Sequence, residues 1–139
     1  MLQIKINEQN KIYSPLRDKW LSKTPEEIVR QEFICHLVNQ YGYKLEQMEE
    51  EHQVNNSQRG QGKSRADIVI WLSKEDKQAK NNAFIVIECK SDKVKIHPED
   101  YYQGNNYASW ANAKFFVTHN NFETKYFQMM EKKMPVDLN

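Results

Sequence analysis

The segment Ala83-Phe84-Ile85-Val86-Ile87-Glu88-Cys89-Lys90 decides the fold, because five apolar residues in a row end on an acid and a lysine. A second apolar run, Ala66-Asp67-Ile68-Val69-Ile70-Trp71-Leu72, precedes it. Neither run alternates between apolar and polar residues, which predicts central strands covered on both faces. The polar stretch 73–82 between them predicts a hairpin-type connection, and therefore antiparallel pairing of the two strands.

Both strands carry charged residues that need an explanation. Asp67 is the second residue of one run and Glu88 lies near the end of the other, and an ionised carboxylate is costly to bury unless it is paired or metal-bound. Residues two apart on a strand share a face, so Glu88 and Lys90 point the same way, and antiparallel pairing puts Asp67 beside them. Two carboxylates suit Mg²⁺, and Lys90 would act on the attacking water or the phosphate. The alternative is that the acids only mark strand ends and that Lys90 pairs with one of them.

The segment Thr24-Pro25-Glu26-Glu27 predicts the start of a helix, with a threonine cap, a proline at the first helical position and a glutamate three residues after the cap. Gly42 is placed to end this helix. Apolar residues recur between the two at helical spacing: Ile28, Val29, Phe33, Ile34, Leu37, Val38 and Tyr41.

The rest of the chain completes an α/β pattern. Residues 43–54 predict a strand, 55–64 a loop, 98–112 a helix and 114–118 a strand, while 122–130 fit either a strand or a strand that runs into a helix. Residues 1–23 predict an irregular lead-in, with a hairpin of 2–6 and 12–20 as the alternative. This order predicts one domain over residues 1–139, in which a small central mixed sheet is flanked by helices in three layers.

Composition narrows the class of protein. Hydrophobic residues make up 39% of the chain, which indicates a globular domain, and no apolar run approaches the ~20 residues that span a bilayer. The N-terminus lacks the order of a signal peptide, so a cytoplasmic protein without membrane contact is expected. Cys35 and Cys89 predict buried thiols, and neither belongs to a zinc-binding pattern. The formal net charge of +1 neither supports nor excludes a nucleic-acid substrate.

Several motifs together resemble one family. Asp67, followed about twenty residues later by Glu88-Cys89-Lys90, resembles the D…(D/E)-x-K signature of PD-(D/E)XK nucleases, with Ala66 in place of the usual proline. Residues 24–31 resemble the opening helix of the N-terminal domain in restriction (R) subunits of type I restriction–modification enzymes. The segment 103–107 matches the Q-x-x-x-Y motif of that family, and 65–69 and 86–90 fit its two strands. The resemblance covers residues 24–120.

The resemblance implies a restriction-endonuclease-like core and a Mg²⁺- or Mn²⁺-dependent DNA endonuclease. Asp67 and Glu88 would bind the metal and Lys90 would be catalytic. The implied partners are double-stranded DNA and the motor, methyltransferase and specificity components of a restriction complex. Two alternatives remain open: a DNA- or subunit-docking module with the same fold and little activity alone, or a repair, recombination or RNA nuclease.

Further residues are implicated at the edge of this centre. The resemblance implies that Gln103 and Tyr107 support the site and the DNA backbone. They are one helical turn apart and share a face, so both could reach a phosphate together. The alternative is that Tyr107 is a core aromatic residue and Gln103 a solvated neighbour. Glu27 is either a third metal ligand, as in many nucleases of this class, or only the glutamate of a capping box. Lys63 and Arg65 would contact the DNA backbone or lie in a solvated loop. The segment 57–64 resembles a phosphate-binding P-loop but lacks the preceding strand and following helix.

Overall fold

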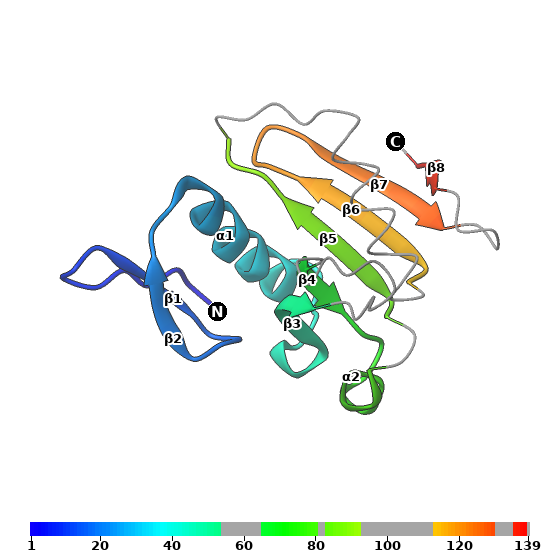
Figure 1. Cartoon of the computed structure of the whole chain (residues 1–139), viewed down its shortest axis with the longest axis horizontal. Coiled ribbons are helices and arrows are strands. Elements are labelled where there is room, and N and C mark those ends of the chain that lie inside the picture. Colours follow the sequence, from blue (N-terminus) through cyan, green and yellow to red (C-terminus); the bar gives the residue numbers. More distant parts are fainter. Residues whose placement is uncertain (54–64, 81–82, 93–112, 130–134, 139) are drawn as a thin grey trace.

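A computed structural model of the chain describes residues 1–53, 65–80, 83–92, 113–129 and 135–138. It is an α/β protein with one six-stranded mixed sheet in the order β3-β4-β5-β6-β7-β8 and a separate two-stranded sheet formed by β1 and β2 (Figure 1). The elements are β1 (Lys11–Ser14), β2 (Lys19–Ser22), α1 (Pro25–Asn39), the 3-10 helix η1 (Leu45–Gln47), β3 (Met48–Gln53), β4 (Arg65–Ile70), α2 (Lys74–Ala79), β5 (Ile85–Cys89), β6 (Phe115–His119), β7 (Thr124–Met129) and β8 (Pro135–Asp137).

The centre of the sheet confirms the predicted strand pairing. β4 and β5 are antiparallel, with Ile68 opposite Ile87, whereas β5 and β6 are parallel, with Glu88 opposite Thr118. β6 and β7 are again antiparallel. The carboxyl ends of β5 and β6 therefore lie together at the same edge of the sheet as the start of β4.

Two local expectations need correction. The connection between β4 and β5 is more than a simple polar hairpin loop, because it contains the short helix α2, whose Ser73 side chain accepts the Asp76 N–H at 3.1 Å. The residues of α2 are almost all polar, so the sequence shows no apolar repeat that would predict a helix there. Residues 1–23 likewise contain a hairpin, but its strands are β1 and β2, with the Ile12 side chain fully buried, and the expected strand 2–6 contributes an isolated bridge between Ile6 and Ile12. The open choice over residues 122–130 resolves into strand β7, Thr124–Met129.

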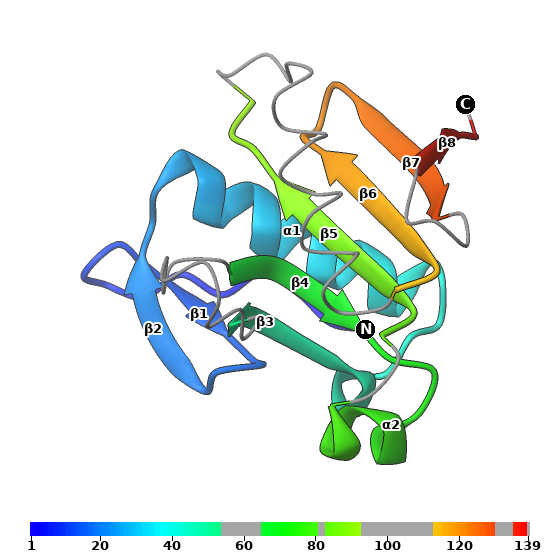
Figure 2. The ribbon, with the colours of Figure 1, turned by 45° about the vertical axis from the view of Figure 1, so that its right-hand side comes forward.

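Helix α1 begins where the sequence predicts. Thr24 Oγ1 accepts the Glu27 N–H at 3.1 Å and Pro25 occupies the first helical position. The helix ends at Asn39, and Gly42 follows with a φ of +77°, a backbone conformation that favours glycine. Figure 2 shows α1 lying across one face of the sheet.

Apolar side chains cover both faces of the sheet. On the face toward α1, the core consists of Val29, Phe33, Ile34, Leu37, Met48, Ile68, Ile70, Ile87, Cys89 and Val117. A second cluster is formed by Ala66, Val69, Trp71, Ala83, Val86, Ala113, Phe116 and Phe127. This double burial explains why neither central strand alternates in sequence. The helix expected over residues 98–112 lies outside the described residues.

The two cysteines differ in their surroundings. Cys89 is buried in the core and Cys35 is half-buried, and both are free thiols. Within the described part of the chain, no helix has the length and apolar character needed to cross a membrane.

Candidate active site

Asp67 and Glu88 meet where β4 and β5 separate. The paired ladder ends at Ile68 and Ile87, and one further step in the same register would bring Asp67 opposite Glu88. At this position a side-chain hydrogen bond replaces the backbone pairing, because Asp67 Oδ2 accepts the Cys89 N–H at 2.8 Å. The Asp67 carboxylate is therefore held between the two strand ends, beside the side chain of Glu88.

The pKa values of both carboxyl groups are raised, mainly by burial. Burial raises the pKa of Asp67 to about 6, although the Cys89 N–H and the Arg30 charge oppose the shift. The pKa of Glu88 is raised well above its ordinary value by burial, and then by the charge of Asp67 and a hydrogen bond between the two carboxyls. Within the described residues, the buried Oε1 of Glu88 has no hydrogen-bond partner. Asp67 and Glu88 thus face one another and do not point to opposite sides of the sheet.

Lys90 follows Glu88 at the end of β5, as the strand period predicts. Its N–H donates to the carbonyl oxygen of His119 at 2.9 Å, which extends the pairing of β5 and β6 beyond Cys89. The positive charge of Lys90 opposes the upward shift in the pKa of Glu88. The lysine is therefore electrostatically coupled to the carboxyl pair.

Arg30, on the buried face of α1, connects the helix to the carboxyl pair. Its Nη1 lies 3.3 Å from Asp67 Oδ1 and 2.9 Å from Glu51 Oε1, and its Nε lies 3.0 Å from Glu27 Oε2. Burial alone would lower the pKa of Arg30, but the hydrogen bonds and charge of Glu27, together with the charge of Asp67, raise it above its ordinary value. Arg30 is thus a permanent cation shared among three carboxylates.

Glu27 lies behind this arginine. Its carboxylate accepts hydrogen bonds from Arg30, from Gln31 Nε2 at 2.9 Å and from Arg17 Nη2 at 3.5 Å. Burial would raise the pKa of Glu27, but the hydrogen bonds of Arg30 and Gln31 lower it. Only half of the expected capping box is formed, because the Glu27 N–H is capped by Thr24 while its carboxylate binds these three side chains.

Sequence reasoning missed three residues of this site. Arg30 follows Glu27 by one helical turn on the buried face of α1, and its contact with Asp67 depends on the packing of α1 against β4. Glu26 is exposed, yet its charge contributes to the raised pKa values of Asp67 and Glu88.

Thr118 is the third. It pairs with Glu88 across β5 and β6, it is fully buried, and its Oγ1 has no hydrogen-bond partner within the described residues. Only the register of the parallel strands reveals it.

The remaining predicted site residues are not placed. Lys63, Gln103 and Tyr107 lie outside the described residues, and of Arg65 only the backbone at the start of β4 is described. In the part of the chain that is described, no group of three or more His, Cys, Asp or Glu side chains is arranged to hold a metal ion. The candidate centre there is therefore a pair of carboxylates.

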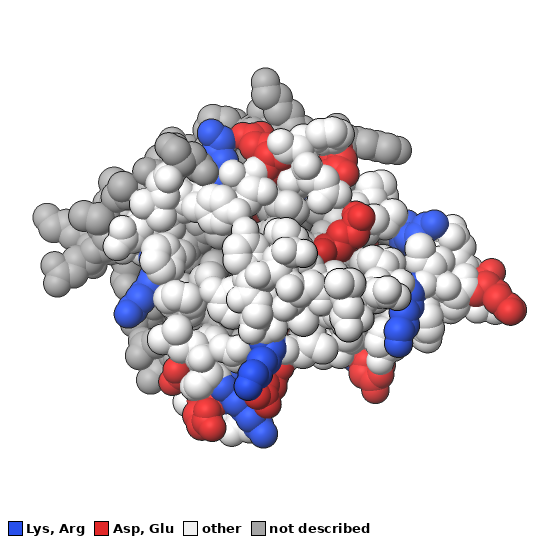
Figure 3. All heavy atoms as spheres, turned by 180° about the vertical axis from the view of Figure 1, so that it is seen from behind, with Lys and Arg blue, Asp and Glu red and all other residues white. Residues whose placement is uncertain are grey.

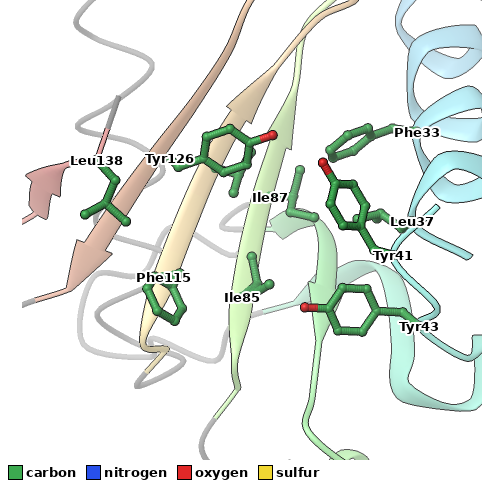
Figure 4. A pocket seen from close by; sticks show the side chains of 10 residues that line it. Phe33, Leu37, Tyr41, Tyr43, Ile85, Ile87, Phe115, Tyr126 and Leu138 are labelled. Carbon is green, nitrogen blue, oxygen red and sulfur yellow. The ribbon is translucent and has the colours of Figure 1, made fainter.

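A cavity of about 350 Å³ lies on the opposite side of the sheet from Glu88. It opens between α1 and strands β5 to β7, and its lining includes Phe33, Tyr41, Ile87 and Tyr126 (Figure 4). Because Ile87 and Glu88 are neighbours on one strand, their side chains point to opposite faces. The cavity is almost entirely apolar and contains none of the residues assigned to the carboxyl centre.

The comparison with protein families identifies the group to which this fold and site belong. The family model described as the N terminus of the type I restriction enzyme R protein (HSDR_N) matches residues 25–138, from the first residue of α1 to the end of the main sheet. Asp67, Glu88 and Lys90 all lie within the match. No curated protein and no solved structure matches the chain. The chain therefore belongs to the family of type I restriction enzyme R protein N-terminal domains.

Proposed function

We propose that this domain is a metal-dependent endonuclease that hydrolyses DNA phosphodiester bonds within a type I restriction system. The observation that carries the proposal is the Asp67–Glu88 pair, in which Glu88 is buried and Asp67 is partly buried, with Lys90 two residues after Glu88. Two adjacent carboxylates that are largely shielded from water have unfavourable free energy unless a proton or a cation lies between them. Family membership supports the restriction role, and the site supports the chemistry.

The donor set fits Mg²⁺ or Mn²⁺. Carboxylate oxygens are the ligands that these hard cations prefer, and Glu88 Oε1 has no partner within the described residues. Asp67 and Glu88 would hold the ion, while Arg30 and the Cys89 N–H fix the orientation of Asp67. A bound ion would supply charge stabilisation at the phosphate and a water of lowered pKa.

The other residues have separate roles in this proposal. Lys90 stabilises negative charge on the phosphate or orients the attacking water, because a charged lysine has donors and no acceptor. Gln103 and Tyr107 contact the DNA backbone, with Lys63 and Arg65 as further phosphate contacts. The Glu27 carboxylate contacts two guanidinium groups, those of Arg30 and Arg17, as well as the Gln31 amide. Two cations already balance its charge, which favours a role in holding Arg30 over a role as third ligand.

Cleavage of double-stranded DNA tests the proposal. Supercoiled plasmid is incubated with the protein in Mg²⁺, in Mn²⁺ and in excess chelator, beside Glu88→Ala and the surface variant Lys74→Ala. We expect cleavage by the wild type and Lys74→Ala only with a divalent ion, and none by Glu88→Ala. Cleavage by Glu88→Ala at the wild-type rate would refute the proposed site. A folded wild type without activity, alone or with the rest of a restriction complex, would favour a docking module.

A further inference from the structure

Charge is unevenly distributed along the chain. Residues 1–24 contain five Lys or Arg against two Asp or Glu, whereas residues 25–139 contain fifteen against seventeen. Of the two acids in the first segment, Asp18 accepts a hydrogen bond from the Tyr13 hydroxyl. The N-terminal segment is therefore the basic part of a nearly neutral protein. Seen from behind, the end of the molecule that carries the β1–β2 hairpin shows both basic and acidic side chains (Figure 3).

The hairpin has two distinct faces. Ile12 and Ser14 point inward and are buried, while Tyr13 pairs with Trp20 on the outer face with ring centroids 5.2 Å apart. Trp20 is 41% exposed.

Two lysines flank the aromatic pair. Lys11 lies on the same face of β1 as Tyr13 and is exposed. Lys5 runs alongside β1, because its carbonyl accepts the Tyr13 N–H at 3.0 Å, and its Nζ lies 5.7 Å from the centre of the Tyr13 ring. We call Lys5, Lys11, Tyr13 and Trp20 the hairpin face. Lysines neutralise phosphates of duplex DNA, and side chains such as tyrosine also contact its phosphates and sugars.

The hairpin is fixed to the elements that hold the candidate site. In the loop between β1 and β2, Arg17 Nε lies 2.6 Å from Glu50 on β3, and the Ser14 hydroxyl donates to the same carboxylate. Arg17 also contacts Glu27, which binds Arg30, which in turn contacts Asp67. Arg17 is therefore connected to Asp67 through the side chains of Glu27 and Arg30. Figures 1 and 2 both show the hairpin beside the start of α1.

We propose that the hairpin face binds the sugar–phosphate backbone of duplex DNA that occupies the site. The lysines pair with phosphates, and Trp20 and Tyr13 pack against the sugars. The inference rests on the proposed function, since it assumes a DNA substrate. The family match begins at residue 25, so this surface lies outside the part of the chain that the family model covers.

Binding of a fluorescent 30-base-pair duplex by the full chain, in Ca²⁺ or without metal and across a range of salt concentrations, tests the inference. The double variant Lys5→Gln/Lys11→Gln removes two charges from the hairpin face. Its matched control is Lys74→Gln/Lys114→Gln, which removes two exposed charges elsewhere. A third variant, Trp20→Ala, removes the exposed ring, and thermal melting establishes that each variant is folded.

We expect the hairpin double variant to bind roughly tenfold more weakly, with a salt slope shallower by about 2, because two phosphate contacts are lost. The control should match the wild type, and Trp20→Ala should lose affinity at an unchanged slope. Equal affinity and slope in the hairpin and control variants would overturn the inference and leave the face to a protein partner. Cleavage that still depends on Glu88 would then leave the proposed function intact, whereas a wild type that neither binds nor cleaves DNA overturns both.

Discussion

Arg30 Nη1 lies 3.3 Å from Asp67 Oδ1, and this contact connects the opening helix to the candidate site. The other oxygen of Asp67 accepts the Cys89 N–H at 2.8 Å, so each oxygen of the carboxylate has a donor. A carboxylate oxygen can accept more than one interaction, so both oxygens keep capacity toward a cation. Helix α1 thereby fixes the orientation of the Asp67 carboxylate on β4 through Arg30.

The first prediction is that Arg30→Lys lowers the cleavage rate by roughly 10- to 100-fold in a folded protein. Lysine carries a point charge without the planar fork and cannot bond Glu27, Glu51 and Asp67 at once, so Asp67 loses its fixed orientation. Arg17→Lys is the control, because Arg17 contacts Glu27 and Glu50 but not Asp67. Single-turnover cleavage rates and melting temperatures measure the two effects. Equal rate losses in both variants would show that the ion-pair network acts only through stability.

The second prediction concerns the stability of the metal-free protein. The pKa values of Asp67 and Glu88 are raised in the folded state, so this pair makes folding most favourable at low pH. That contribution is lost as pH rises from the unfolded values near 4 through the folded value of about 6 for Asp67, and at higher pH for Glu88. Glu88→Gln removes one buried charge and should therefore raise the free energy of unfolding at pH 8 by about 1 kcal/mol or more.

Denaturant unfolding at several pH values between 5 and 8, in chelator, measures this effect. The advantage of Glu88→Gln should shrink toward pH 5, and divalent ions should stabilise the wild type more than the variant. A variant less stable than the wild type at pH 8 would show that the two carboxyls do not repel each other in the folded protein.

The third prediction is that Glu27→Gln destabilises the domain by about 2 kcal/mol or more but changes Mn²⁺ affinity by no more than a few-fold. Glutamine removes the negative charge that both Arg30 and Arg17 contact, and breaking a buried ion pair leaves unpaired charge behind. A residue that only completed a capping box would tolerate glutamine. Calorimetric titration with Mn²⁺, beside melting curves, separates the outcomes. A loss of affinity as large as that of Glu88→Ala would make Glu27 a ligand.

Much of the core was predictable from sequence because its signals are local. The cap at Thr24, the unbroken apolar strands and the positions of Asp67 and Glu88 within them each depend on a few adjacent residues. Their combination predicted the helix, the antiparallel pair and the meeting of the two acids at one edge. The short period of a strand also predicted that Lys90 follows Glu88 on the same face.

What the sequence could not supply depends on distant pairing. Thr118 lies beside Glu88 only because β6 pairs with β5 in one particular parallel register. Arg30 could be recognised as a site residue only once α1 was placed against β4, since Arg30 and Asp67 are 37 positions apart. The sequence offered a hairpin of 2–6 and 12–20 as an alternative, but β1 pairs with β2 instead, because the chain turns again between residues 14 and 19, where no glycine marks the turn.

The last prediction is that Lys90→Ala abolishes cleavage while leaving the affinity for divalent metal largely intact. Lys90 affects the pKa of Glu88 through its charge and, as a cation, cannot donate a lone pair to a metal. Removal of Lys90 should raise the activation free energy of cleavage without preventing metal binding, whereas Glu88→Ala should lose both metal binding and cleavage. Losing one positioned electrostatic group typically lowers the rate by on the order of 10²–10³, which a plasmid-cleavage gel resolves.

If Lys90 were only an ion-pair partner of the two acids, Lys90→Ala would destabilise the strands and would lose activity through unfolding. Lys90→Met distinguishes the two roles, because methionine keeps most of the apolar stem of lysine and removes only the charge. We expect Lys90→Met to melt near the wild type, to bind Mn²⁺ by calorimetry and to remain inactive. Wild-type cleavage by folded Lys90→Met would exclude a catalytic lysine, and the chemistry would then depend on the carboxyl pair and the bound ion alone.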